Sequence, residues 1–179
     1  MNKTQATNIP IKNLDVALNR DVFSRSLVGE LSGLLEEMIG LEEASGFISV
    51  VGQRIGSEIG EAYKNALQVD KLSKQQISEV LVDLKHRIQG GFYIIELTDE
   101  KVVLGNTACP FEDKVLNKPS LCMMTSNVFG SIAAENNGYA KVTLNETIAR
   151  GNASCLVTVY FKPTDEANRA EGRVYYDAN

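Results

Sequence analysis

Apolar residues recur three and four residues apart through the first half of the chain, which is the spacing of one face of an α-helix. The pattern predicts a first helix over residues 21–40 and a second over residues 42–67. A third helix opens at Ser73, where Gln76 completes a capping box, and Gly90-Gly91 ends it. We expect one core-facing set of side chains on each helix: Phe23, Leu27, Leu31, Leu34, Leu35 and Met38; then Phe47, Ile48, Val51, Ile55, Ile59 and Tyr63; then Ile77, Val80, Leu81, Leu84 and Ile88.

The second half of the chain carries strand patterns instead. Aromatic and β-branched residues at 92–97 favour a strand, and residues 102–104 form its hairpin partner. A proline suits the first turn of the helix that we expect over residues 119–138. Two further strands follow at residues 140–145 and 155–161. This order predicts an α+β fold, with N-terminal helices packed on a mostly antiparallel four-stranded sheet and one further helix between the hairpins.

The length of 179 residues fits one domain with its own core. Apolar residues make up 44% and charged residues 23%, which are ordinary values for a soluble protein. We expect a flexible polar arm over residues 1–20, a single domain over residues 21–163, and a charged, disorder-prone tail over residues 164–179. Within that tail, residues 174–176 could still pair as a short strand.

The overall charge limits the classes of partner. A net charge of -5 argues against non-specific nucleic-acid binding, which needs a basic surface. No apolar run is long enough for a membrane span, and the polar N-terminus lacks the apolar core of a signal peptide. We therefore expect a cytoplasmic protein that binds neither DNA nor membrane and whose thiols stay reduced.

Three cysteines carry the candidate chemistry: Cys109, Cys122 and Cys155. They fall in a loop, in the first turn of a helix and at the start of a strand, so they could converge. The helix N-terminus favours a thiolate at Cys122, and soft thiolates select zinc, copper(I) or iron–sulfur clusters. The alternative is that all three are buried core residues. Three ligands fall short of the usual four, and the remaining position could be open or be filled by a small molecule, a partner residue, Glu112, Asp113 or Glu146.

The single histidine, His86, is not expected to join this group. Its helical phase points away from the apolar face that contains Leu81 and Leu84, so we expect it to be solvated. No general base is then available for a cysteine nucleophile, and no paired carboxylates or phosphate loop occur. The sequence therefore predicts a protein that is not an enzyme.

Glycines recur at every fourth residue of the second helix, at Gly52, Gly56 and Gly60. A strip without side chains lets another backbone or a ligand approach closely. We expect tight helix packing, within the fold or across a dimer.

Three further residues are candidate ligand contacts. Arg54 lies beside the glycine strip and could bind a carboxylate, although an exposed arginine is the simpler interpretation. Met123 and Phe129 could line a ligand pocket, although both fit a core helix equally well.

The segments around the cysteines resemble a known family. They read Cys109-Pro110-Phe111, Lys118-Pro119-Ser120-Leu121-Cys122 and Gly151-Asn152-Ala153-Ser154-Cys155. They are similar to the cluster-binding half of the iron–sulfur-sensing repressors of the Suf operon. That resemblance implies that Cys109, Cys122 and Cys155 are ligands of a [4Fe–4S] cluster. Those repressors carry an N-terminal winged helix for DNA, whereas only a short polar segment precedes the first helix here.

Residues 22–162 also resemble the vinyl-reductase-like sensory domains and the related methanogen output domain. This resemblance implies a sensory domain that binds a small molecule or metal and signals to a kinase or transcription regulator. We expect this chain to be a stand-alone domain and a homodimer. We expect it to hold an iron–sulfur cluster, or zinc as the alternative metal. A small-molecule-binding sensory domain with structural zinc or free thiols, and a non-catalytic scaffold, are the alternative functions.

Overall fold

The structure is a computed structural model that describes residues 15–177. Most of the expected N-terminal arm, residues 1–14, lies outside the described residues. The helical half contains α1 (Arg20–Ile39), α2 (Leu41–Leu67) and α3 (Lys74–Arg87), close to the predicted ranges. The capping box at the start of α3 is confirmed, because the Gln76 backbone N–H donates to Ser73 Oγ and the Ser73 N–H donates to Gln76 Oε1.

One antiparallel sheet of five strands follows: β1 (Phe92–Leu97), β2 (Lys101–Asn106), β3 (Tyr139–Glu146), β4 (Cys155–Tyr160) and β5 (Arg173–Tyr176). The strand order is β1-β2-β4-β3-β5, and every neighbouring pair is antiparallel. The prediction of a four-stranded sheet is therefore wrong.

The additional strand, β5, lies in the segment that was expected to be a charged tail, and it confirms that residues 174–176 can pair as a short strand. It pairs with β3, and the Tyr175 ring lies where a side chain on Gly130 would be, 2.2 Å from an ideal Cβ. The Tyr175 hydroxyl also forms a 2.8 Å hydrogen bond with Ser126 Oγ. A short helix, α5 (Asp165–Arg169), precedes the strand and is capped by Thr164. A partly buried aromatic ring and pairing with β3 thus hold a segment whose composition is mostly polar.

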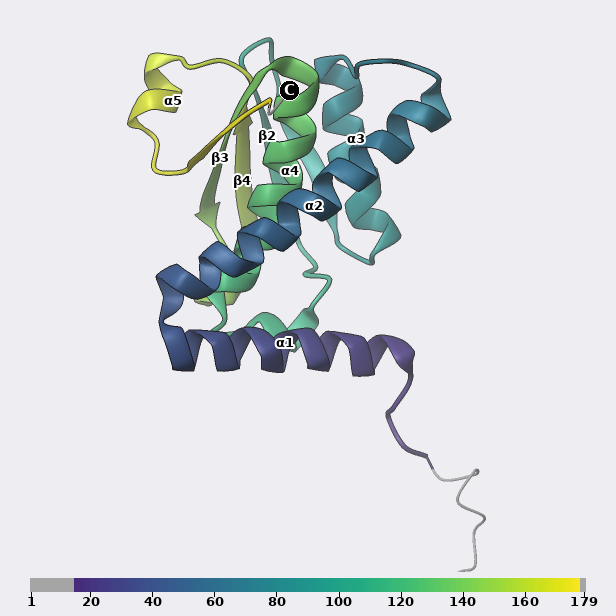
Figure 1. The fold of residues 1–179 in the computed structure, drawn as a ribbon, viewed down its shortest axis with the longest axis vertical. Helices are drawn as coiled ribbons and strands as arrows, with labels where there is room; N and C mark the ends of the chain where they lie inside the picture. The colour runs from purple at the N-terminus through teal and green to yellow at the C-terminus, as the bar shows by residue number, and fades with distance from the viewer. Residues whose placement is uncertain (1–14, 178–179) are drawn as a thin grey trace, which may run out of the picture.

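The helices form layers over one face of the sheet (Figure 1). Helix α4 (Cys122–Asn137) packs against the sheet, chiefly on β3, and α2 crosses over α4 diagonally. This crossing is tight. A Cβ on Gly52 would lie 2.9 Å from Asn127 Cβ, and one on Gly56 would lie 3.0 Å from Val128 Cα. The predicted tight packing of the glycine strip is confirmed, and it occurs within the fold.

The expected core-facing side of α1 is wrong, and that of α2 is confirmed only near its C-terminal end. On α1 the buried residues are Gly29 and Ser32, whereas Phe23 is 59% and Met38 is 73% exposed. On α2 the buried positions are Ala44, Ser49 and the three glycines of the strip, and Ile59 and Tyr63 are partly buried against the core. Close approach of two backbones selects small residues, so most of the other bulky side chains of these helices face outward. The α3 side is confirmed except at Ile88, which is 51% exposed.

Helix α1 lies apart from the sheet, along one end of the domain (Figure 1). It packs on α2 and on two short 3-10 helices, η2 (Glu112–Val115) and η3 (Pro119–Leu121). Within residues 15–177, no helix combines the length and the apolar character needed to cross a membrane.

Candidate functional site

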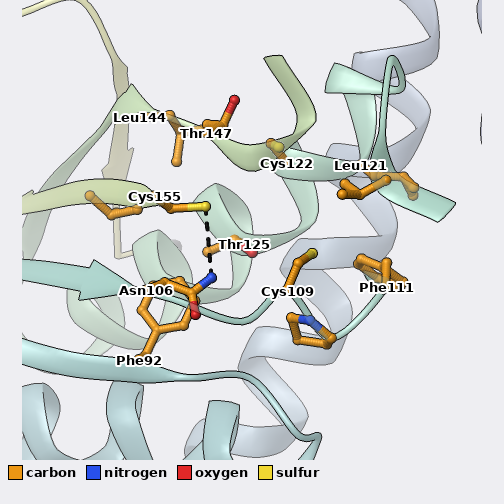
Figure 2. Close-up of a pocket in the computed structure, with 13 residues that line it drawn as sticks. Phe92, Asn106, Cys109, Phe111, Leu121, Cys122, Thr125, Leu144, Thr147 and Cys155 are labelled. Carbon is orange, nitrogen blue, oxygen red and sulfur yellow. Dashed lines mark hydrogen bonds between the residues drawn. The ribbon is translucent and has the colours of Figure 1, made fainter. Parts of the chain in front are cut away.

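The three cysteines line one small cavity of about 30 Å³. Cys109 lies in the loop after β2, Cys122 is the first residue of α4, and Cys155 is the first residue of β4. Figure 2 shows their sulfur atoms directed toward a common space between the sheet and the loop. The expected convergence of loop, helix and strand ends is therefore observed.

Asn106, at the end of β2, connects two of the cysteine segments. It pairs with Cys155 across the β2–β4 ladder, and its Nδ2 donates to Cys155 Sγ at 3.7 Å. Its Oδ1 accepts a 3.1 Å hydrogen bond from the Ala108 backbone N–H, next to Cys109. Cys155 Sγ also accepts from the Ile148 backbone N–H at 3.4 Å. One buried amide thus fixes the start of the Cys109 loop relative to Cys155.

The remaining walls of the cavity are mainly apolar, and Phe92, Phe111, Val115, Leu121, Leu144 and Val157 contribute to them. Two hydroxyl groups, of Thr125 and Thr147, interrupt this apolar surface. Thr147 Oγ1 is buried and finds no hydrogen-bond partner at ordinary distance among residues 15–177. A buried polar atom without a close partner calls for an explanation, and here the hydroxyl lies near Cys122, where it favours the thiolate.

Burial raises the pKa of two of the thiols, those of Cys122 and Cys109. It is the main reason that the pKa of Cys122 is raised to about 11, and the two neighbouring cysteines add to the rise. The nearby Thr147 hydroxyl and Arg150 favour the thiolate only in part. Burial also raises the pKa of Cys109. Desolvation therefore outweighs the helix N-terminus that was expected to ionise Cys122.

Lys85 of α3 is a buried cation beside this cavity, and our reading of the sequence missed it. It is 4% exposed, and its Nζ donates a 2.8 Å hydrogen bond to Thr125 Oγ1. The ammonium also lies 5.4 Å from the ring centroids of both Phe92 and Phe129. Burial lowers its pKa to about 8, and the three cysteines act in the opposite direction. The available signal was its phase, because Lys85 continues the buried row of Ile77 and Leu81 at four-residue spacing.

No acidic residue forms an ion pair with Lys85 in the part of the chain that the structure describes. Two of the candidates for a fourth ligand are paired elsewhere: Glu112 with Arg25 and Asp113 with Lys114. Glu146 is exposed at the end of β3, and none of the three lines the cavity.

The other candidate residues lie outside the cavity. Arg54 is exposed on α2, Phe129 is a core residue in edge-to-face contact with Phe92, and Met123 lines a neighbouring groove. His86 is exposed, as expected, and its Nε2 is 2.7 Å from the Phe92 carbonyl oxygen.

The cysteines of the cavity are the donor type that a thiolate-bound metal centre uses, although they are not arranged as a metal-binding site. Three soft sulfurs line one space beside a buried cation. Within residues 15–177, however, no three or more Cys, His, Asp or Glu side chains are arranged as a metal ion requires.

Comparison with known proteins identifies the family. The model of methanogen output domain 1 matches residues 27–160, well over half of the chain, and this range includes all three cysteines. A search of curated proteins gave no match. The resemblance to the methanogen output domain is thus confirmed, whereas the cysteine-motif resemblance to the Suf-operon repressors stays a prediction. We conclude that this chain belongs to the methanogen output domain 1 family.

Proposed function

We propose that this output domain senses through its cysteine cavity, where Cys109, Cys122 and Cys155 would bind an iron–sulfur cluster, and that it signals to a partner protein. One observation carries the proposal: three thiols converge on a cavity beside a buried lysine that has no acidic partner within residues 15–177. Zinc is the alternative metal for the same thiols.

The charge of Lys85 supports an anionic occupant. A buried ammonium is unfavourable unless a negative charge compensates it. The aromatic rings of Phe92 and Phe129 and the Thr125 hydroxyl supply only partial compensation. Metal-bound thiolates would supply negative charge on the cavity side of the lysine. Lys85 would therefore destabilise the protein without a bound cluster and stabilise the protein with one.

The residues around the sulfurs would tune the bound group. A cluster supplies a redox centre whose potential depends on hydrogen bonds to sulfur and on solvent exposure. Asn106 Nδ2 and the Ile148 N–H already donate to Cys155 Sγ. The apolar walls keep water away from all three thiols, each of which is only partly exposed.

Contacts with α1 offer a route for the signal. Glu112, three residues after Cys109, forms an ion pair with Arg25 of α1. Ser120, two residues before Cys122, forms a buried 2.6 Å hydrogen bond with Ser32 Oγ, and its backbone N–H donates to Glu36 at 3.0 Å. A shift of the Cys109 or Cys122 segment would therefore be transmitted to α1.

The test is anaerobic purification and reconstitution, followed by iron and sulfide analysis and an absorption spectrum. We expect iron, sulfide and thiolate-to-iron absorption in the wild type, and a large loss of each in Cys109→Ser, Cys122→Ser and Cys155→Ser. Met124→Leu is the matched control, because it removes a sulfur from the same helix outside the cavity. A colourless, iron-free wild type after reconstitution would refute the cluster, and stoichiometric zinc would identify the alternative metal.

We infer a second candidate function, binding of a small anion, from the groove next to the cavity. This groove has a volume of about 490 Å³ and contains Met123, Arg150 and Arg173 among its lining residues. The volume is typical of small-molecule sites, and two guanidinium groups suit a carboxylate or phosphate. Thermal shifts with carboxylates and phosphates should vanish in Arg150→Ala and Arg173→Ala but persist in Arg54→Ala and in the cysteine variants.

A further inference from the structure

Helix α1 exposes its large apolar side chains to solvent, and the side that carries small residues packs on the domain. We define the α1 stripe as Phe23, Leu27, Leu31, Leu34 and Met38. These side chains are 59%, 49%, 53%, 52% and 73% exposed, in that order. With 3.6 residues per turn they fall within roughly 80° of the helix circumference.

The opposite side of α1 is fixed to the domain. Gly29 is buried there, and a Cβ on it would lie 3.2 Å from Lys114 Cβ. Ser32 is fully buried in its hydrogen bond to Ser120. Rotation of α1 to bury the stripe would push large side chains into a space that admits only small ones. The stripe must therefore be covered from outside the domain, or remain exposed.

We propose that the α1 stripe pairs with the α1 stripe of a second copy of this chain, antiparallel, to form a homodimer. Leu27, Leu31, Leu34 and Met38 are separated by four, three and four residues, the a and d spacing of a coiled-coil seam. In the antiparallel arrangement, Leu27 of one copy lies near Met38 of the other, and Leu31 lies near Leu34. This proposal does not depend on the cysteine cavity.

The exposed apolar area corresponds to a small interface. A large apolar side chain contributes roughly 150–200 Å² when fully exposed, so the half-exposed stripe offers roughly 400–500 Å². This is about half of the roughly 800 Å² per partner of a standard interface. The largest apolar patch of a monomeric protein is often functional, and the stripe is of that size.

The charges along α1 favour a second copy in the antiparallel orientation. Arg20 lies at the start of α1, whereas Glu37 lies near its end and Glu42 and Glu43 follow in the first turn of α2. None of these four residues forms an ion pair within residues 15–177. Antiparallel pairing would place the acidic end of each helix near the start of the other helix, where the charges of Arg20 and Asp21 balance. Parallel pairing would bring the two acidic ends together.

Analytical ultracentrifugation of the purified protein at micromolar concentration tests the dimer. We expect a dimer for the wild type and a monomer with unchanged far-UV circular dichroism for Leu31→Glu and Leu34→Glu. Ile95→Glu is the matched control, because Ile95 is 53% exposed on β1, away from α1, and should leave the dimer intact. A monomeric wild type, or a dimer that survives both α1 substitutions, would overturn the proposal.

Cross-linking with a short bismaleimide tests the orientation. Leu31→Cys should cross-link to itself, Met38→Cys should not, and a mixture of Leu27→Cys and Met38→Cys should form the mixed pair. The wild type, with its three partly buried native cysteines, measures the background. Self-cross-linking of Met38→Cys would contradict the antiparallel arrangement, and the sedimentation results would separate that outcome from the absence of a dimer.

Discussion

Lys85 Nζ donates a 2.8 Å hydrogen bond to Thr125 Oγ1, and Thr125 lines the cavity that the three cysteines share. The bond crosses from α3 to α4. It brings a buried positive charge to a site that otherwise contains only neutral groups and thiols. This relationship makes the thiol cavity different from an ordinary apolar core, because a core without a partner anion gains nothing from an ammonium group.

Replacing Lys85 with methionine should affect the empty and the loaded protein in opposite directions. The fall in the pKa of Lys85 from 10.5 to about 8 corresponds to roughly 3 kcal/mol of destabilisation at pH 7. We expect Lys85→Met to raise the free energy of unfolding of the metal-free protein by up to this amount, measured by urea unfolding. In anaerobic reconstitution the same variant should retain less iron.

The difference in stability between the wild type and Lys85→Met should depend on pH in a defined direction. Because the pKa of Lys85 is lower in the folded state, the unfolded state binds more protons between about pH 8 and 10.5. The free energy of unfolding of the wild type should therefore rise toward that of Lys85→Met as the pH increases through this window. The raised pKa of Cys122 acts in the opposite sense above pH 9, but it is common to both proteins and largely cancels in the difference. If the difference in free energy of unfolding between the two proteins stayed constant from pH 7 to 10.5, Lys85 would not be a buried cation.

The crossing of α2 over α4 should not tolerate a side chain at Gly56. An added Cβ would lie 3.0 Å from Val128 Cα and 3.1 Å from Ser131 Cβ, and such overpacking costs about 1–3 kcal/mol. We expect Gly56→Ala to lower the free energy of unfolding by this amount. Gly46, on the same helix, has nothing within 4 Å of an added Cβ, so Gly46→Ala should be neutral or stabilising by about 0.5–1 kcal/mol. Equal effects of the two substitutions would exclude close packing at this crossing.

The fifth strand should depend on one aromatic ring. Tyr175 covers Gly130 and bonds to Ser126, so Tyr175→Ala should destabilise the domain by about 3 kcal/mol, within the range for loss of a buried aromatic side chain. Its neighbour Tyr176 is 71% exposed, and Tyr176→Ala should change stability by less than about 1 kcal/mol. Proteolysis that removes β5 at the same rate in both variants would show that Tyr175 does not hold the strand.

Much of the fold could be predicted from the sequence where the signal is local. The capping box at Ser73, the tight-packing glycines and the element ranges follow from neighbouring residues, and the structure bears them out. The three cysteines could be placed at element ends, and their convergence on one cavity followed from that placement.

Other features depend on packing between distant segments. A short strand at residues 174–176 could be inferred locally, but its pairing partner could not. Strand β5 pairs with β3, and Tyr175 packs over Gly130, forty-five positions earlier in the chain. A hydrophobic stripe in the sequence shows only that a helix has an apolar side. Whether that side of α1 faces its own domain depends on the small residues of α1 that pack against the domain. By itself the sequence determined which residues could carry the chemistry and which helices are amphipathic. Only the tertiary structure placed Lys85 beside the thiols and left the α1 stripe exposed, because both results come from close contacts that no local pattern encodes.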